Sequence, residues 1–193
     1  MTESSGLVEA LEPVAAALQA LNVRFFVGGS IASAYHGASR STMDVDLVAD
    51  ITLSHVKPFT TRLGNQFYLS QAAILDAINR LACFNIIHLP TSYKVDIFVF
   101  KRRQFDEFSM ARAELGRVAS HCNFEVPIAS PEDIILSKLE RYRLGNEVSE
   151  RQWEDVVRVV KIFGNQIDLN YLNRNAIELE IDDLLRRVLE LES

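Results

Sequence analysis

Cysteine, tryptophan, proline and glycine are scarce in this chain of 193 residues, with 2, 1, 5 and 8 copies. Two cysteines, Cys83 and Cys122, make no disulfide framework, which argues against a small secreted scaffold and favours a reducing compartment. No apolar run approaches the roughly 18 residues of a membrane helix. Residues 1–5 lack the basic and apolar segments of a secretory signal. We therefore expect a cytoplasmic protein with no membrane partner.

Positive charge is also in short supply, because the formal net charge is −6. Broad electrostatic capture of nucleic acid needs clustered lysine and arginine, so this balance argues against it. A single bound nucleotide is not excluded, since a bound metal ion reverses the local field. Two basic groups are either a local face for a polynucleotide or ordinary solvated surface: Lys101-Arg102-Arg103 and Lys138/Arg141/Arg143.

The remaining composition, 48% apolar and 24% charged, is that of an ordinary globular protein and excludes disorder and low complexity. Apolar periodicity predicts helices over residues 6–21, 30–36, 52–63 (broken near Pro58), 71–80, 130–144, 150–163, 170–179 and 182–192. Strands are predicted over residues 24–27, 45–48, 67–69, 83–88 and 93–100, with a hairpin of 118–121 and 124–127.

The order of these elements predicts an α/β (α+β) fold with a small mixed sheet flanked by helices. The first part, residues 1–127, would form the core, and residues 128–193 would form a helical region packed on it. Ser130 marks the start of that region. It is followed by Pro131 and, three residues on, by Asp133, which together read as a capping box.

Three aspartates stand out within the predicted strands. Residues two apart on a strand point to the same face, so Asp44 and Asp46 project together while Val45 enters the core. Asp96 interrupts a later apolar alternation in the same way. If the two strands are neighbours, three carboxylates meet on one sheet face. The alternatives are a solvated strand end, a pairing with nearby arginine, or an exposed edge position for Asp96.

Three converging carboxylates repel one another, and a hard divalent cation is the usual remedy. Mg²⁺ prefers one or two carboxylates together with water and phosphate oxygens. Asp44, Asp46 and Asp96 are therefore the candidate catalytic and metal-ligating residues, with Mg²⁺ or Mn²⁺ as the metal. Such a geometry suits two-metal phosphoryl transfer, in which Asp96 could also accept a proton from the attacking hydroxyl.

A glycine turn precedes the aspartate pair by about a dozen residues. Gly28 and Gly29 follow a strand and lead into a short helix, so their backbone N–H groups can approach a phosphate. Ser30 can cap that helix and donate to a phosphate oxygen. Arg40 can orient a carboxylate or neutralise triphosphate charge, and for Thr42 we expect only a local hydrogen bond that fixes the loop.

These motifs together resemble the DNA polymerase β-like nucleotidyltransferase superfamily. Its pattern is Gly-Gly or Gly-Ser, a gap of about a dozen residues, an apolar-flanked Asp-x-Asp, and a third acid on a later strand. More narrowly, residues 27–30 (VGGS), 35–37 (YHG) and 40–46 (RSTMDVD) look like the minimal and abortive-infection toxin-type nucleotidyltransferases. Residues 130–139 resemble the helix after their catalytic sheet, and residues 151–155 resemble the element that follows.

The resemblance implies a nucleotidyltransferase core, a nucleoside triphosphate as cosubstrate, and Lys138 near the nucleotide phosphates or base. From the residues alone, a surface position for Lys138 stays an equal alternative, and Asp155 can pair with Lys138 or Arg151. The implied reaction moves a nucleoside monophosphate onto an acceptor hydroxyl and releases pyrophosphate.

The other hypothesis is an inactive nucleotide-binding or interaction module of the same fold. An RNA 3′ end, a protein side chain and a small molecule stay open as acceptors, and an antitoxin would be the partner of a toxin.

Overall fold

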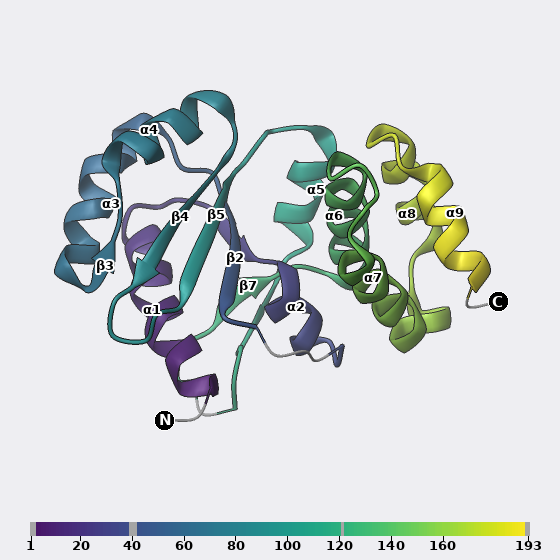
Figure 1. Ribbon diagram of the computed structural model, residues 1–193, viewed down its shortest axis with the longest axis horizontal. Coiled ribbons are helices and arrows are strands. Elements are labelled where there is room, and N and C mark those ends of the chain that lie inside the picture. Colours follow the sequence, from purple (N-terminus) through teal and green to yellow (C-terminus); the bar gives the residue numbers. More distant parts are fainter. Residues whose placement is uncertain (1–2, 39–41, 121, 192–193) are drawn as a thin grey trace.

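The computed structural model describes residues 3–38, 42–120 and 122–191. Within these ranges, seven strands form one mixed sheet in the order β3-β4-β5-β2-β1-β7-β6. Helices lie on both sides of the sheet, and the C-terminal helices gather at one end of the molecule (Figure 1). This architecture confirms the expected fold class of a small mixed sheet flanked by helices.

The strands are β1 (Phe25–Val27), β2 (Asp44–Ala49), β3 (Phe67–Tyr68), β4 (Cys83–His88), β5 (Lys94–Val99), β6 (Glu114–Gly116) and β7 (Val126–Ile128). The helices are α1 (Glu3–Ala20), α2 (Gly29–Tyr35), α3 (Val56–Leu63), α4 (Gln71–Arg80), α5 (Gln104–Arg112), α6 (Pro131–Leu144), α7 (Glu150–Phe163), α8 (Leu169–Glu178) and α9 (Asp182–Leu191). Three 3₁₀ turns, η1 (Leu53–His55), η2 (Gly64–Gln66) and η3 (Gly164–Gln166), complete the described elements.

The two faces of the sheet differ in character because strand residues alternate between them. On β2, Val45, Leu47 and Ala49 are fully buried, whereas the residues between them are partly exposed. The same alternation runs along β5. Helix α1 contacts β5 and α3, and α4 contacts β4. Figure 1 shows α1, α3 and α4 on one side of the sheet and α5 to α9 on the other, so the partly exposed face turns toward the C-terminal helices.

Strand pairing at the centre of the sheet brings distant segments of the chain together. Strand β2 runs parallel to β5 and antiparallel to β1. Strand β1 in turn pairs in parallel with β7, which leads directly into α6. These pairings place three parts of the chain around one region of the molecule. They are the turn after β1, the first halves of β2 and β5, and helix α6.

Most of the predicted elements are confirmed within one or two residues, but three predictions are wrong. The segment after β5 contains a helix, α5, that the sequence pattern did not indicate. The predicted hairpin is displaced, because β7 pairs with β6 rather than with residues 118–120, and His121 lies outside the described residues. Pro58 does not break a helix; it lies in the first turn of α3, where its missing N–H costs nothing.

Helix α6 begins at the predicted position, but only the Ser130 half of the predicted capping box forms, because the Asp133 carboxylate binds the Ser130 hydroxyl rather than its backbone N–H. The Ser130 hydroxyl accepts a hydrogen bond from the backbone N–H of Asp133, and Pro131 occupies the first turn. The Asp133 carboxylate accepts from the Ser130 hydroxyl at 2.7 Å, and also from Ser109 on α5 and Tyr171 on α8. This buried carboxylate therefore ties α5, α6 and α8 together.

No helix in the described part of the chain is long and apolar enough to cross a membrane.

Candidate functional site

Two strands bring the predicted carboxylates to one place. Asp46 on β2 and Asp96 on β5 are register partners in a parallel pair, and Asp44 lies two residues before Asp46 on the same face. Directly opposed residues of paired strands have Cβ atoms about 5 Å apart. The strands that the sequence analysis required to be neighbours are therefore neighbours, and all three aspartates line one pocket.

The glycine turn packs directly on this acidic group. The Gly28 N–H donates a hydrogen bond of 2.9 Å to the backbone carbonyl of Asp46. Gly29 has a φ of +58°, and a Cβ built on it would lie 1.7 Å from Asp46 Oδ2. Residue 29 must therefore lack a side chain for two reasons, the left-handed backbone and the contact with the carboxylate. The Ser33 hydroxyl donates to the Gly29 carbonyl and supports the turn from within α2.

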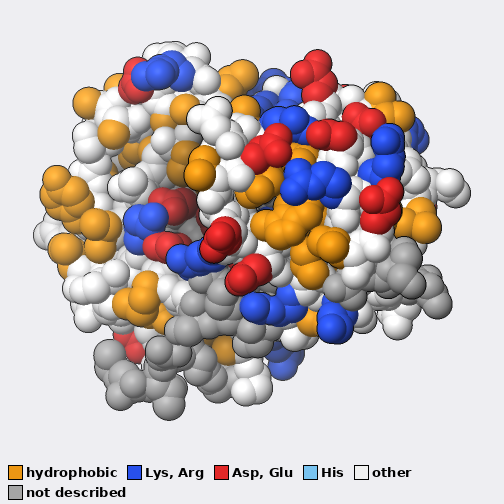
Figure 2. Space-filling view, turned by 45° about the vertical axis from the view of Figure 1, so that its right-hand side comes forward, with side chains coloured by type: hydrophobic (Ala, Val, Ile, Leu, Met, Phe, Trp, Pro, Cys, Tyr) orange, Lys and Arg blue, Asp and Glu red, His pale blue; other side chains and the backbone are white. Residues whose placement is uncertain are grey.

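The pocket between the sheet and the C-terminal helices has a volume of about 270 Å³. Its lining is strongly polar and comprises Gly29, Ser30, Thr42, Asp44, Asp46, Asp96, Lys138, Arg141, Ser149, Arg151, Gln152 and Asp155. In the view of Figure 2, acidic and basic side chains gather around a hollow in the surface, next to a hydrophobic patch. The size and the polarity of the pocket suit a charged small ligand.

Lys94 bridges two of the carboxylates. Its ammonium group lies 2.8 Å from Asp96 Oδ2 and 3.4 Å from Asp44 Oδ1. The hydrogen bond to Asp96, followed by the charge of both carboxylates, raises the pKa of Lys94 against the opposing effect of burial. Sequence reasoning missed this residue, although the two-residue spacing from Asp96 could have placed it on the same strand face.

Arg141 provides a second cation from the opposite wall. It projects from α6 so that its guanidinium lies 3.4 Å from Asp46 Oδ1 and 4.3 Å from the centre of the Phe98 ring. A cation over an aromatic ring gains electrostatic attraction while it stays available to an anion on its edge. Sequence reasoning noted Arg141 only as a member of a basic group, without assigning it to the site.

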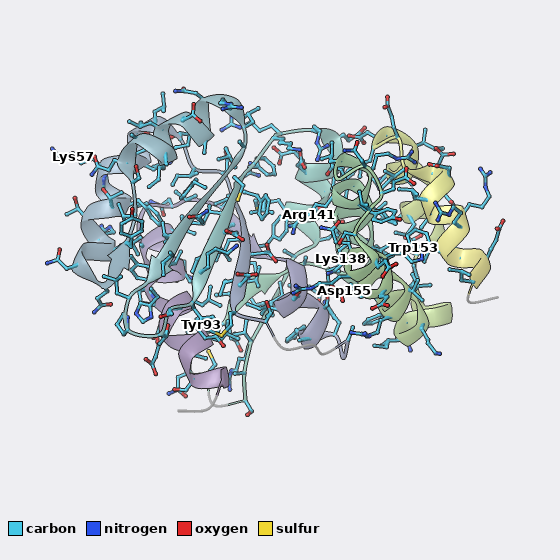
Figure 3. The ribbon with its side chains drawn as sticks, in the orientation of Figure 1. Lys57, Tyr93, Lys138, Arg141, Trp153 and Asp155 are labelled. Carbon is cyan, nitrogen blue, oxygen red and sulfur yellow. The ribbon has the colours of Figure 1, made fainter. Side chains whose placement is uncertain are left out.

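Lys138 and Asp155 form a buried ion pair at the same wall. The Lys138 ammonium donates to Asp155 Oδ2 at 2.9 Å, and both side chains are at least nine-tenths buried. Burial lowers the pKa of Lys138, and the bond to Asp155 opposes that effect. This contact selects one of the two pairings considered for Asp155 and excludes a surface position for Lys138. Figure 3 shows Lys138 and Arg141 on α6 close to Asp155 on α7.

The structure thus brings Ser30, Gly29, Lys138 and the three aspartates around one pocket, and Gly28 lies in a small adjoining cavity. Thr42 makes the expected local hydrogen bonds, accepting from the N–H of Asp44 at 3.2 Å. Arg40 lies outside the described residues, so its predicted role stays a prediction.

The carboxylates of the pocket match a metal site in which protein and substrate share the coordination of the ion. Among the described residues, no group of three or more His, Cys, Asp or Glu side chains is arranged to hold an ion by itself. Asp46 and Asp96 nevertheless oppose each other in register. Mg²⁺ is commonly bound by one or two carboxylates plus substrate phosphates rather than by an all-protein cage. The residues therefore fit a Mg²⁺ ion that arrives with a triphosphate, and they do not form a preassembled cage.

The two cysteines do not offer a reactive thiol. Burial is the main cause that raises the pKa of Cys83 to about 12, and the nearby charges of Asp96 and Asp46 add to it. The Cys83 side chain is exposed, and its Sγ–H donates to the Phe84 carbonyl at 3.5 Å. Cys122 is buried. A thiol held protonated is a poor nucleophile.

The chain matches no protein-family model and no curated protein sequence. It does resemble solved structures across nearly its whole length. The solution structure of the antibiotic-resistance factor ANT(2″)-Ia is 16% identical, covers 96% of this chain and 98% of that chain, and gives a TM-score of 0.57. An antigenic nucleotidyltransferase-like protein from Paracoccidioides brasiliensis is 19% identical, with coverage of 97% and 93% and a TM-score of 0.53.

A crystal structure of ANT(2″)-Ia in complex with adenylyl-2″-tobramycin is 15% identical, covers 88% of this chain and 95% of that chain, and gives a TM-score of 0.54. At these identities the likeness is one of fold. The chain therefore has the nucleotidyltransferase-like fold of these proteins, including the helices that follow the sheet.

Proposed function

We propose that this protein is a nucleotidyltransferase that moves a nucleoside monophosphate from a nucleoside triphosphate to an acceptor hydroxyl and releases pyrophosphate. The observation that carries the proposal is the register pairing of Asp46 with Asp96 beside a turn in which Gly29 leaves room for the Asp46 carboxylate. The fold shared with ANT(2″)-Ia and the nucleotidyltransferase-like protein supports it.

Each wall of the pocket has its own task in this proposal. Asp46 and Asp96, with Asp44 beside them, would hold Mg²⁺ or Mn²⁺ together with phosphate oxygens of the substrate. When bound, the metal would polarise the phosphoryl group and lower the pKa of the acceptor hydroxyl. The backbone of the Gly28–Gly29 turn and the Ser30 hydroxyl would contact the triphosphate, and Arg141 would face it from α6.

Lys138 and Lys94 would balance charge rather than carry out the chemistry. Lys138 is held close to the carboxylates by Asp155, so its position is set before substrate arrives. Lys94 partly offsets the charge of Asp44 and Asp96, which it contacts at 3.4 Å and 2.8 Å. Asp96 is the group that would accept the proton of the acceptor hydroxyl.

The narrower expectations stay predictions from the sequence motifs. These are the toxin-type subfamily, an antitoxin partner and a cytoplasmic location. The role of Arg40 belongs to the same set.

The direct test is transfer of label from each of the four α-labelled nucleoside triphosphates to a cell extract with Mg²⁺, followed by separation of proteins, RNA and small molecules. Wild type should label a discrete acceptor and release pyrophosphate only when that acceptor is present. Asp46→Asn should lower the rate by at least about a hundredfold, because it removes charge where the metal and phosphates meet.

Asp76→Asn is the matched control, because Asp76 is an exposed carboxylate on α4 that contacts only Arg80 among the ion pairs of the described residues. This control should transfer at the wild-type rate. Equal labelling by wild type and Asp46→Asn would reject the assigned site. Nucleotide binding without transfer would support the inactive module, and acceptor-independent release of phosphate would indicate a hydrolase.

A further inference from the structure

The sheet face that carries the aspartates changes from acidic to apolar along β2 and β5. Asp46 pairs with Asp96 at one level, and two residues further on Val48 pairs with Phe98. Cys83 of β4 pairs with Phe98 at that second level. Because residues two apart share a face, the same surface passes from acidic to apolar within about 7 Å. A single ligand can therefore place its reacting group at the aspartates and another part of the same molecule over the apolar residues.

A separate cavity of about 270 Å³ covers this apolar level. Its floor comes from Phe26, Val48 and Phe98, and α5 and α6 form its other walls through residues such as Phe105 and Leu144. This volume lies just below the usual range for small-molecule sites. A cavity of this size has room for one ring system rather than for a large ligand. Hydrophobic residues therefore form a compartment next to the polar pocket.

Arg141 separates the two compartments and belongs to the lining of both. Its guanidinium contacts Asp46 on the polar side and stacks on Phe98 on the apolar side. The apolar cavity thus lies beside the reacting groups of the proposed function, with a single side chain between them. Figure 3 shows Arg141 on the face of α6 that turns toward the sheet.

The charged residues of this cavity do not offer an open carboxylate to a cation. Arg103 binds both acids of the lining, Asp106 at 2.9 Å and Glu140 through a second nitrogen. Lys101 lies 3.7 Å from Glu140 and remains substantially exposed. With Arg141 included, the lining carries three positive and two negative groups. Because Arg141 is paired with Asp46 and Arg103 with the two acids, the partly exposed ammonium group of Lys101 is the group of this lining that can attract an anion.

We infer that this cavity is the acceptor subsite and takes the ring of a small, anionic, hydroxyl-bearing compound. The inference rests on the proposed function. In that reaction the acceptor oxygen forms a bond to the α-phosphorus, the bond from that phosphorus to the pyrophosphate oxygen breaks, pyrophosphate leaves, and the hydroxyl proton passes to Asp96. The ring would lie among the apolar side chains of the lining, beside the Phe98 ring that Arg141 covers, and Lys101 would attract the anionic group.

This acceptor differs in charge from the one joined to adenylate in the ANT(2″)-Ia complex, where the product is adenylyl-2″-tobramycin. Tobramycin carries several amines that are protonated at neutral pH, and such a molecule needs open carboxylates. Because Asp106 and Glu140 are engaged by Arg103, the cavity described here selects against polyamines.

Three ligands with the same ring and different charge test the inference. They are 3-phenyllactate (anionic), 3-phenylpropane-1,2-diol (neutral) and 2-amino-3-phenylpropan-1-ol (cationic), each titrated into the wild-type protein with ligand-observed NMR. We expect affinity to fall in that order, by about threefold to fivefold per unit of charge at a partly exposed site. Lys101→Glu should remove or reverse the order.

Lys57→Glu is the matched control, because it makes the same charge change at an exposed position of α3, far from Arg141 (Figure 3). It should leave the order unchanged. Failure of all three ligands to bind, a preference for the cation, or equal effects of the two lysine variants would overturn the inference. The binding order does not depend on turnover, so absence of nucleotidyl transfer with the order intact would refute the proposed function and leave a ring site that prefers anions. Transfer without the binding order would refute the subsite alone.

Discussion

Asp46 and Asp96 face each other across two parallel strands, although 50 residues separate them in the chain. Three cationic side chains contact or approach this pair. Lys94 contacts Asp96, Arg141 contacts Asp46, and Lys138 lines the same pocket. Each carboxylate of the pair therefore has a cationic partner from the protein itself, which offsets their mutual repulsion. A divalent cation has to compete with these contacts.

Gly29→Ala tests whether the close approach of the turn to Asp46 is required. Alanine at this position faces both the positive φ and an overlap with the Asp46 carboxylate. The control is Gly64→Ala, since Gly64 has nearly the same φ of +57° but nothing within 4 Å of its Cβ position. The control should lose about 1–3 kcal/mol of unfolding free energy from backbone strain alone, because the ψ of Gly64, −143°, lies in a region essentially reserved for glycine.

We expect Gly29→Ala to lose a further 1–3 kcal/mol, roughly the cost of overpacking, and to bind triphosphate more weakly because Asp46 has to move. Urea unfolding and a triphosphate titration of both variants provide the measurements. Equal losses in the two glycine variants would show that Asp46 does not depend on the missing side chain.

Lys94→Met tests the competition between the internal ammonium and a divalent cation. Without Lys94, Asp44 and Asp96 lose their shared counter-charge, so an added cation meets less competition at these two carboxylates. We expect the apparent affinity for Mg²⁺ alone to rise by about threefold, the size expected for a partly exposed ion pair. The measurement is the shift of the melting temperature with Mg²⁺ concentration.

Arg80→Met serves as the control, because Arg80 forms an exposed ion pair with Asp76 on α4. Its Mg²⁺ response should match that of wild type. If Mg²⁺ binding were weaker in Lys94→Met than in wild type, the ammonium would not occupy the place of the cation.

The alternation of β2 was sufficient to predict that Asp44 and Asp46 share a face, because a period of two is a local property of strands. That Asp96 joins them depends on the pairing of β2 with β5, which the sequence analysis could state only as a condition. The cationic partner of Asp46 could not be predicted from the sequence. Arg141 lies 95 positions from Asp46 and contacts it only after α6 has packed. The burial of Lys138 depends in the same way on the docking of α7.

Helix α5 was not predicted, for a different reason. Only Phe105 and Ser109 are buried on it, so no apolar stripe of period 3.6 appears in the sequence. Strand β6 gave no signal either, because it carries an exposed Leu115 and a glycine rather than an alternating pattern. In both cases the tertiary contacts, and not the local pattern, determine the element.

Asp133 predicts a pH dependence of stability. Burial raises the pKa of its carboxyl above the ordinary value of 3.8, against hydrogen bonds from Tyr171, Ser130 and Ser109. The folded state therefore binds the proton more tightly than the unfolded state. The resulting stability is fully present below the unfolded pKa and is lost as pH rises through the folded pKa.

The comparison is urea unfolding of wild type and Asp133→Asn from about pH 4 to pH 7, where each unit of pKa shift corresponds to about 1.4 kcal/mol. The unfolding free energy of wild type should decline relative to the variant as pH rises. Asp76→Asn, at an exposed carboxylate, should show no such trend. A difference that stays constant or grows with pH would contradict the raised pKa.

The central claim is that Asp46 and Asp96 hold a divalent cation together with a triphosphate. It is tested most directly by electron paramagnetic resonance of Mn²⁺, titrated into protein with a non-hydrolysable nucleoside triphosphate analogue. The account predicts that wild type removes free Mn²⁺ beyond the amount bound by the nucleotide alone, and that Asp46→Asn and Asp96→Asn both lose this binding. Undiminished Mn²⁺ binding in the two variants, or none in wild type, would contradict it.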